Sequence, residues 1–265
     1  MRTTMVQGFR AVLGIGRPAK SKILPAICAV IAYVPTIVFV GLAVLIPGDL
    51  LDPNEVATYS DWYGFIISAL VLFTGLVAPE VLTGDRRSGM IGLYLSTPLT
   101  RSTYLAAKLA SVGLTLAIVT IGPGLLLLLG YSFVGEGPGG LVEWVKTFFQ
   151  IVAAGAVISG VYAAVSMAFS SITDRRAFAS AGVILCLVVS AAVSGSLVEV
   201  AELNENIYLL NLFIAPFMLV AHIYGETESL EPDLSLSALV LGNLAWMVAG
   251  FGITWWRYLR MEVTR

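Results

Sequence analysis

The sequence is poor in charge and in the residues that build metal or redox sites. Only 12% of its 265 residues are charged, and it contains two cysteines and one histidine. Both cysteines, Cys28 and Cys186, fall within long apolar stretches, where a free thiol behaves as a small hydrophobic group. We therefore expect neither a disulfide nor a metal site in this chain.

Two further absences concern the source of energy. Ion-driven carriers place ionisable residues within their membrane spans, but the closest such carboxylate here, Glu80, lies only at the end of an apolar stretch. The chain also lacks a glycine-rich phosphate loop that ends in Gly-Lys-Ser or Gly-Lys-Thr. We therefore expect no nucleotide hydrolysis and no cofactor on this chain, so energy for active transport must come from another protein.

Apolar residues dominate what is present, at 58% of the chain with a mean hydropathy of +0.90. A run of about 20 apolar residues crosses the roughly 30 Å hydrocarbon core of a bilayer. Runs of this kind predict an all-α polytopic membrane protein. Seven uncharged runs are candidates: 23–48, 62–79, 109–135, 147–173, 177–198, 206–225 and 234–256.

The positions of lysine and arginine indicate how many runs cross, because basic residues in short loops stay cytoplasmic. If 206–225 does not cross, fourteen of the fifteen basic residues share one side, and Lys146 alone lies on the other. We therefore predict six transmembrane helices in one transmembrane domain, residues 1–265. The protein would be a multi-pass protein of the plasma (inner) membrane with both termini cytoplasmic. Seven spans with an external C-terminus are the alternative.

Run 206–225 lies within an acidic outer segment, 199–233, and is interrupted by Pro216. Backbone that enters a membrane without crossing it must be shielded by protein. We interpret this run as a re-entrant hairpin packed on the outer ends of spans 5 and 6.

The leader, residues 1–22, is predicted to contain a basic amphipathic helix that lies on the inner leaflet. Arg2 and Arg10 accompany apolar residues at helical spacing, namely Met5, Phe9, Val12 and Leu13. A disordered basic tail is the alternative for 14–22.

Residues 80–108 form a long hydrophilic loop on the basic side. They are too many for a tight turn, and their spacing favours one or two short helices against the membrane surface, where a soluble partner can bind. Pro98 stops the first helix, and Thr100 or Ser102 caps the helix that enters span 3. One face of the first helix would carry Met90, Ile91, Tyr94 and Leu95.

Glu80 ends the second apolar run, where its charge is unfavourable both beside the C-terminal dipole of a helix and near lipid. A cationic partner is therefore expected for it. Arg86, Arg87 or an arginine of the leader could supply the charge.

A short charged motif occurs twice on the basic side. Asp85-Arg86-Arg87 follows span 2, and Asp174, Arg175 and Arg176 follow span 4. We interpret the two motifs as independent anchors that keep the first and second loops cytoplasmic.

The first loop resembles the signature of the type-2 permease family of ATP-binding-cassette transporters. The matching residues are Pro79-Glu80, Asp85 to Gly89, Leu93 to Arg101, Tyr104 and Lys108. The resemblance implies a permease that dimerises with itself or a relative and exports its substrate by alternating access. It would bind a separate ATPase subunit that carries ATP and Mg. Its coupling residues would be Arg86, Arg87, Met90, Ile91, Tyr94, Leu95 and Arg101.

The same resemblance implies a substrate path between spans 2 and 5. Its candidate lining is apolar and suits an amphiphilic or hydrophobic molecule: Phe65, Leu72, Phe73, Leu185, Val189 and Ser194. Two readings from other classes stay open. The chain could be a passive channel or membrane scaffold, or an intramembrane serine hydrolase that uses Ser194 and His222.

Overall fold

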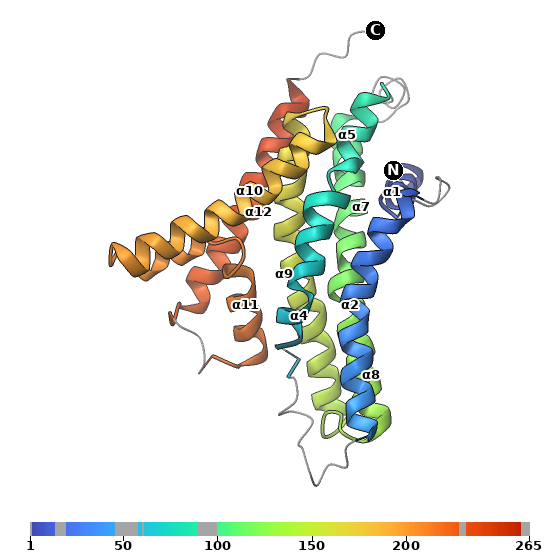
Figure 1. The fold of residues 1–265 in the computed structure, drawn as a ribbon, viewed down its shortest axis with the longest axis vertical. Helices are drawn as coiled ribbons and strands as arrows, with labels where there is room; N and C mark the ends of the chain where they lie inside the picture. Colours follow the sequence, from blue (N-terminus) through green and yellow to red (C-terminus); the bar gives the residue numbers. More distant parts are fainter. Residues whose placement is uncertain are drawn as a thin grey trace.

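The computed structural model describes residues 2–13, 20–45, 58–59, 61–89, 100–227 and 232–260, and within these ranges every regular element is a helix. Six of the helices are long and apolar enough to cross a membrane (Figure 1). This confirms the predicted all-α fold with six spans. The spans are Lys22–Leu45, Trp62–Arg87, Arg101–Val134, Leu141–Ile172, Arg176–Val200 and Leu236–Leu259.

Several spans are built from more than one helical element. Span 1 is α2 (Lys20–Leu45), span 4 is α9 (Leu141–Ile172) and span 6 is α12 (Leu236–Leu259). The other three are composite. Span 2 joins α4 (Asp61–Leu72), the π-helix η1 (Phe73–Val77) and α5 (Glu80–Arg87); span 3 joins α7 (Arg101–Thr120) and α8 (Gly122–Val134); span 5 joins α10 (Arg176–Gly195) and the π-helix η2 (Ser196–Val200).

Helix α9 forms the centre of the molecule and packs against α7, α10, α11 (Ala215–Tyr224) and α12 (Figure 1). Small side chains along α9 allow this close packing, as is usual between membrane helices. At Gly250 of α12, a Cβ would lie 2.6 Å from the carbonyl oxygen of Ala164, so no larger residue fits there. The core of the fold is therefore a bundle around one long, buried helix.

The leader contains helix α1 (Arg2–Val12), which packs across α7 and α5. The hydroxyl of Ser111 donates to the carbonyl of Met5 at 2.8 Å. A Cβ at Gly8 would lie only 2.5 Å from the same hydroxyl oxygen, so the two helices are in close contact. A helix in the leader was predicted, and its location on the inner leaflet stays a prediction.

Run 206–225 does not form a seventh spanning helix. It folds into the 3₁₀ helix η3 (Glu205–Leu210) and the ten-residue helix α11, and Pro216 lies in the first turn of α11 instead of breaking a helix. Side chains from two neighbouring helices, α9 and α12, donate to its backbone carbonyls: Tyr162 to Leu212, Trp246 to Leu209, Asn243 to Ala215 and Gln150 to Ile223. The segment is thus held by protein, and its entry into the membrane stays a prediction.

The orientation of the spans is tested by accessibility. Helix α1 and the C-terminal end of α12 lie at the same end of the molecule (Figure 1), and nearly all basic residues belong to this end of the spans. Single cysteines at Asn54 and Ser229 are expected to label from outside intact cells, and one at Ser102 only after permeabilisation. Asn54, Ser229 and Thr264 lie outside the described residues. External labelling of a cysteine at Thr264 would contradict a cytoplasmic C-terminus.

Candidate functional site

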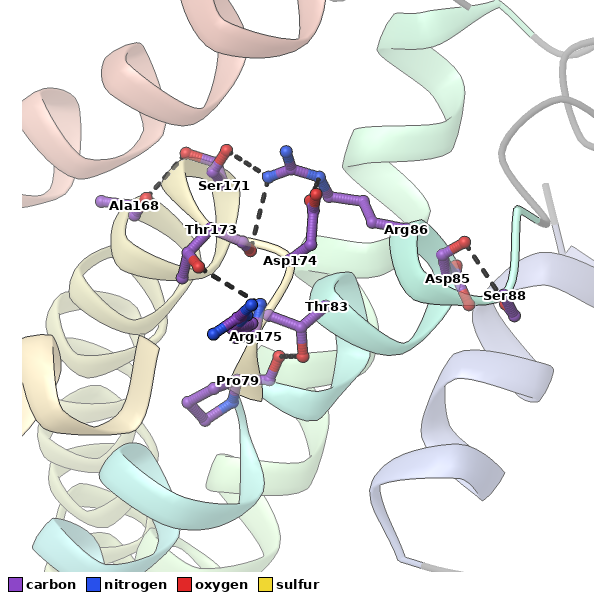
Figure 2. A network of polar contacts seen from close by, with 10 residues as sticks. All are labelled: Pro79, Thr83, Asp85, Arg86, Ser88, Ala168, Ser171, Thr173, Asp174 and Arg175. Carbon is purple, nitrogen blue, oxygen red and sulfur yellow. Dashed lines mark hydrogen bonds and ion pairs between the residues drawn. The ribbon is translucent and has the colours of Figure 1, made fainter. Parts of the chain in front are cut away.

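The basic end of span 2 carries a polar network that joins both basic loops (Figure 2). Its centre is α5, a short helix whose adjacent residues Asp85 and Arg86 point in different directions. Arg86 points toward the loop between α9 and α10, whereas the carboxylate of Asp85 contacts α7. Two neighbouring residues therefore tie α5 to two different spans.

Arg86 binds the C-terminal end of α9. Its Nη1 atom donates to the carbonyl of Ser171 at 2.6 Å and lies 3.5 Å from the carbonyl of Thr173, while its Nε atom pairs with Asp174 Oδ1 at 2.6 Å. The last carbonyls of a helix lack partners within the helix and carry a partial negative charge. The Arg86 side chain is only 11% exposed, whereas that of Asp174 is 62% exposed. The hydrogen bond from Arg86 to Ser171 is thus better protected from solvent than the ion pair of Arg86 with Asp174.

Asp85 joins the start of the first loop to its end. Its Oδ2 atom accepts a hydrogen bond from the hydroxyl of Tyr104 at 2.7 Å and pairs with Lys108 Nζ at 2.6 Å. Lys108 is almost completely buried, with 2% of its side chain exposed, and its ammonium group lies 5.7 Å from the centre of the Tyr104 ring. A buried ammonium requires such a counter-charge, so this pair fixes α5 against α7.

Arg176 binds span 2 from the first turn of α10. Its Nη1 atom pairs with Glu80 Oε2 at 2.5 Å, and its Nη2 atom donates to the carbonyl of Leu76 at 2.6 Å. The expected charge pair for Glu80 therefore exists. Its described partner is Arg176, which the sequence prediction did not name, and Arg86 is bound to Asp174 instead.

The predicted conflict between Glu80 and a helix dipole is wrong. Glu80 is the first residue of α5, because η1 and Pro79 interrupt the regular α-helix before it. A carboxylate in the first turn of a helix is favoured by the dipole. Glu80 is therefore placed favourably both by its helix and by Arg176.

The two charged motifs are connected by ion pairs, and their role as anchors that keep the two loops cytoplasmic stays a prediction. Arg86 of the first pairs with Asp174 of the second, and Arg176 reaches back to Glu80. Arg87 and Arg175 are exposed. Two ion pairs thus join the ends of the two loops.

Arg101, at the start of span 3, binds the carbonyl groups at the end of a helix as Arg86 does, here at the end of span 6. Its Nη1 atom donates to the carbonyls of Tyr258 at 3.1 Å and Leu259 at 2.6 Å, at the C-terminal end of α12. The hydroxyl of Thr100 accepts from the amide of Thr103 at 3.3 Å, so of the two predicted caps of α7, Thr100 and Ser102, it is Thr100 that caps the helix. Arg101, the first residue of α7, therefore also binds the end of α12.

The predicted apolar docking face lies outside the described residues. It consists of Met90, Ile91, Tyr94 and Leu95. Its role in coupling stays a prediction, as does that of Arg87.

The six candidates for a substrate path do not share one environment. Phe73 and Ser194 are buried inside the protein, whereas Phe65, Leu185 and Val189 are exposed. Leu72 is half-buried. Spans 2 and 5 meet where a Cβ at Gly75 would lie 2.9 Å from Ile184. The structure thus gives no single surface that all six residues line.

The serine hydrolase reading gains no support from Ser194 and His222. The hydroxyl of Ser194 donates to the carbonyl of Ala191, and Nδ1 of His222 donates to the carbonyl of Met218. Each side chain is thus bonded within its own helix, and the structure shows no hydrogen bond between the two.

A family model described as "ABC-2 family transporter protein" matches residues 51–263. No curated protein matches the chain. The matched range starts after span 1 and contains every residue of the polar network, from Leu76 to Leu259.

Proposed function

Because the chain belongs to the ABC-2 family of transporter proteins, we propose that it is the membrane-spanning permease subunit of an ATP-binding-cassette exporter. Six apolar helices and the family together make it a multi-pass membrane protein. The energy for transport would come from a separate ATPase subunit, since the chain has no phosphate-binding loop.

The observation that carries this proposal is the polar network at the basic end. It links the first loop to span 4 through Arg86, to span 3 through Asp85 and to span 6 through Arg101. The second loop is linked to span 2 through Arg176. A displacement of either loop by a soluble partner would therefore reach four spans through bonds that are already in place.

The proposed mechanism follows from how these bonds are arranged. Loop 80–108 is held at its start by Asp85 and at its end by Lys108, so a partner that binds between them moves α5 and α7 together. Arg86 then passes this motion to the end of α9. We propose that ATP and Mg bind on the partner and that their turnover alternately shifts these helices.

The remaining features of the proposal come from the family resemblance, from the positions of lysine and arginine and from the apolar residues of the candidate path. The permease pairs with a second copy or a relative, lies in the plasma (inner) membrane with both termini cytoplasmic, and exports an amphiphilic or hydrophobic molecule. The exposed apolar side chains Leu185 and Val189 are compatible with such a cargo. Lipid-facing helices have apolar side chains too, so cargo identity requires a transport assay.

The partnership is tested by purification from native membranes. The chain alone is expected to show no ATP hydrolysis, whereas the complex with its co-purifying subunit hydrolyses ATP in the presence of Mg. Mass spectrometry identifies the subunit. A chain that purifies without any ATPase is the result expected of a passive channel or scaffold, and hydrolysis by the chain alone would contradict the proposal.

A matched pair of variants tests where the ATPase binds. Tyr94→Ala is expected to weaken the complex by about 1 to 3 kcal/mol, because a central aromatic often anchors an interface. Asn54→Ala, on the opposite side of the membrane in the predicted topology, is the control. Equal binding by both variants would exclude Tyr94 as an anchor.

A further inference from the structure

We propose that span 2 bends at the π-helix Phe73–Val77 and that Arg176, by binding both Leu76 and Glu80, holds this bend in one position. The inference deepens the proposed function, because it identifies the part of the permease that would move. It rests on the proposed function only for the use of that motion in transport.

The backbone of span 2 is weakened at this point. The amide of Ala78 bonds to the carbonyl of Phe73 at 2.9 Å, five residues back, which is the wider spacing of a π-turn. Pro79 follows directly and has no amide hydrogen to donate. Proline and π-bulges are two common causes of helix kinks. Their succession makes residues 73–79 the softest part of span 2.

Arg176 bridges this soft part. Leu76 lies before Pro79 and Glu80 lies after it, and one guanidinium group binds both, at 2.6 Å and 2.5 Å. Because the guanidinium is planar and rigid, it fixes the separation of the two groups that it binds. The separation of the last turn of η1 from the first turn of α5 is thereby held. A lysine could reach only one of these groups firmly, since its ammonium is a point charge on a flexible stem.

The two sides of the bend are held by different kinds of contact. On its C-terminal side, α5 is fixed by the ion pair of Asp85 with Lys108 of α7 and by the bonds of Arg86 to the end of α9. On its N-terminal side, α4 packs against α7 and is joined to span 1 by a hydrogen bond from Trp62 Nε1 to Thr36 Oγ1 at 2.8 Å. We infer that the N-terminal side of the bend is the side that moves when the kink changes.

At its outer end, span 2 and the residues just before it contact the segment that contains α11 and the helix α9. Thr58 donates to Glu226 Oε2 at 3.1 Å, and the ring of Tyr59 stacks on that of Tyr224 at a centroid distance of 6.4 Å. Tyr63 also donates to the carbonyl of Ile151 on α9, at 3.3 Å. These outer contacts are the ones that must break or shift when the bend changes.

The size of the motion follows from helix geometry. Gly64 lies eleven residues before Gly75, or roughly 16 Å along the helix axis at about 1.5 Å per residue. A change of about 20° in the kink would displace Gly64 by about 5 to 6 Å. Distances of this size are measured by pulsed electron paramagnetic resonance between spin labels.

The experiment uses the full chain in lipid nanodiscs, with Cys28 and Cys186 replaced by alanine. One label pair joins Gly64→Cys on α4, where a side chain meets open space, to Val142→Cys on α9, which is exposed. A reference pair joins Val142→Cys to Leu241→Cys on α12, also exposed. The reference pair reports loosening of the whole fold, whereas the first pair reports the bend.

Arg176→Ala is expected to shift or broaden the first distance by about 5 Å and to leave the reference distance unchanged. Arg175→Ala, which removes an exposed arginine next to it, should change neither. Adding Pro79→Ala to Arg176→Ala restores an amide donor at position 79. The distribution of the first label distance should then become narrower than in Arg176→Ala alone. Glu80→Gln keeps the bond to Leu76 and should give a smaller shift in the same direction.

Three results would overturn the inference. The first is a Gly64–Val142 label distance in both Arg176→Ala and Glu80→Gln that equals the wild-type distance. The second is a change in the reference distance as large as the change in the first distance. The third is a distance distribution in Arg176→Ala that does not become narrower when Pro79→Ala is added. None of these measurements needs an ATPase. The inference can therefore fail while the ATPase still binds, and it can hold in a chain for which no ATPase is found.

Discussion

Asp85→Asn is expected to lower the stability of the folded chain more than the other single substitutions considered at the basic end. Asparagine keeps the shape of the side chain and an acceptor for Tyr104, but it removes the described counter-charge of Lys108. Because Lys108 is 2% exposed, its ammonium stays buried. Removing one partner of a buried ion pair typically costs about 3 to 5 kcal/mol.

The measurement is thermal unfolding of the purified chain in detergent, followed by size-exclusion chromatography. Lys108→Met combined with Asp85→Asn should recover part of the loss, because it removes the buried charge as well. Arg87→Ala serves as the control, since Arg87 is exposed in the same helix. If Asp85→Asn unfolds at the same temperature as Arg87→Ala, the pair does not hold the loop.

The second large effect is expected at Arg86, where the two partners of one ion pair should behave unequally. Arg86→Ala removes charge-assisted bonds to the end of α9, at a cost of about 1.5 to 3 kcal/mol. Asp174→Asn removes a carboxylate that is mostly exposed, so its cost should stay below about 1 kcal/mol.

Both variants are compared by thermal unfolding and, in the complex, by the ratio of transport to ATP hydrolysis. Arg86→Ala should lower this ratio, whereas Asp174→Asn should leave it close to that of the wild type. Arg86→Lys is informative, because it keeps the charge and loses the planar fork. Equal losses in Arg86→Ala and Asp174→Asn would show that the ion pair, not the bond to the helix end, carries the contact.

The number of spans could be predicted because it depends on local properties. Uncharged runs of sufficient length identified the six spans, and the positions of lysine and arginine identified 206–225 as the run that does not cross. The cap at Thr100 was equally local, since it depends on one hydroxyl and the next helical turn.

The partners within the polar network could not be predicted, because they depend on how distant segments pack. Glu80 and Arg176 are separated by 96 residues, and Arg101 and Leu259 by 158. Charge patterns reveal that a carboxylate needs a cation, but several cations were possible. The prediction that Glu80 lies at the C-terminal end of a helix, against its dipole, was wrong for a different reason. The uncharged run 62–79 resembles one uninterrupted helix, and neither its length nor its hydropathy reveals the π-turn that ends at Val77.

The separation of Glu80 and Arg176 also sets an order of events during synthesis. A ribosome that adds about 5 to 20 residues per second needs about 5 to 20 s to proceed from the first of these residues to the second. Spans 1 and 2 therefore leave the ribosome before Arg176, the proposed holder of the bend in span 2, has been made. In early insertion intermediates of this chain, span 2 lacks the contacts of Leu76 and Glu80 with Arg176. These contacts form only after span 5 has been inserted.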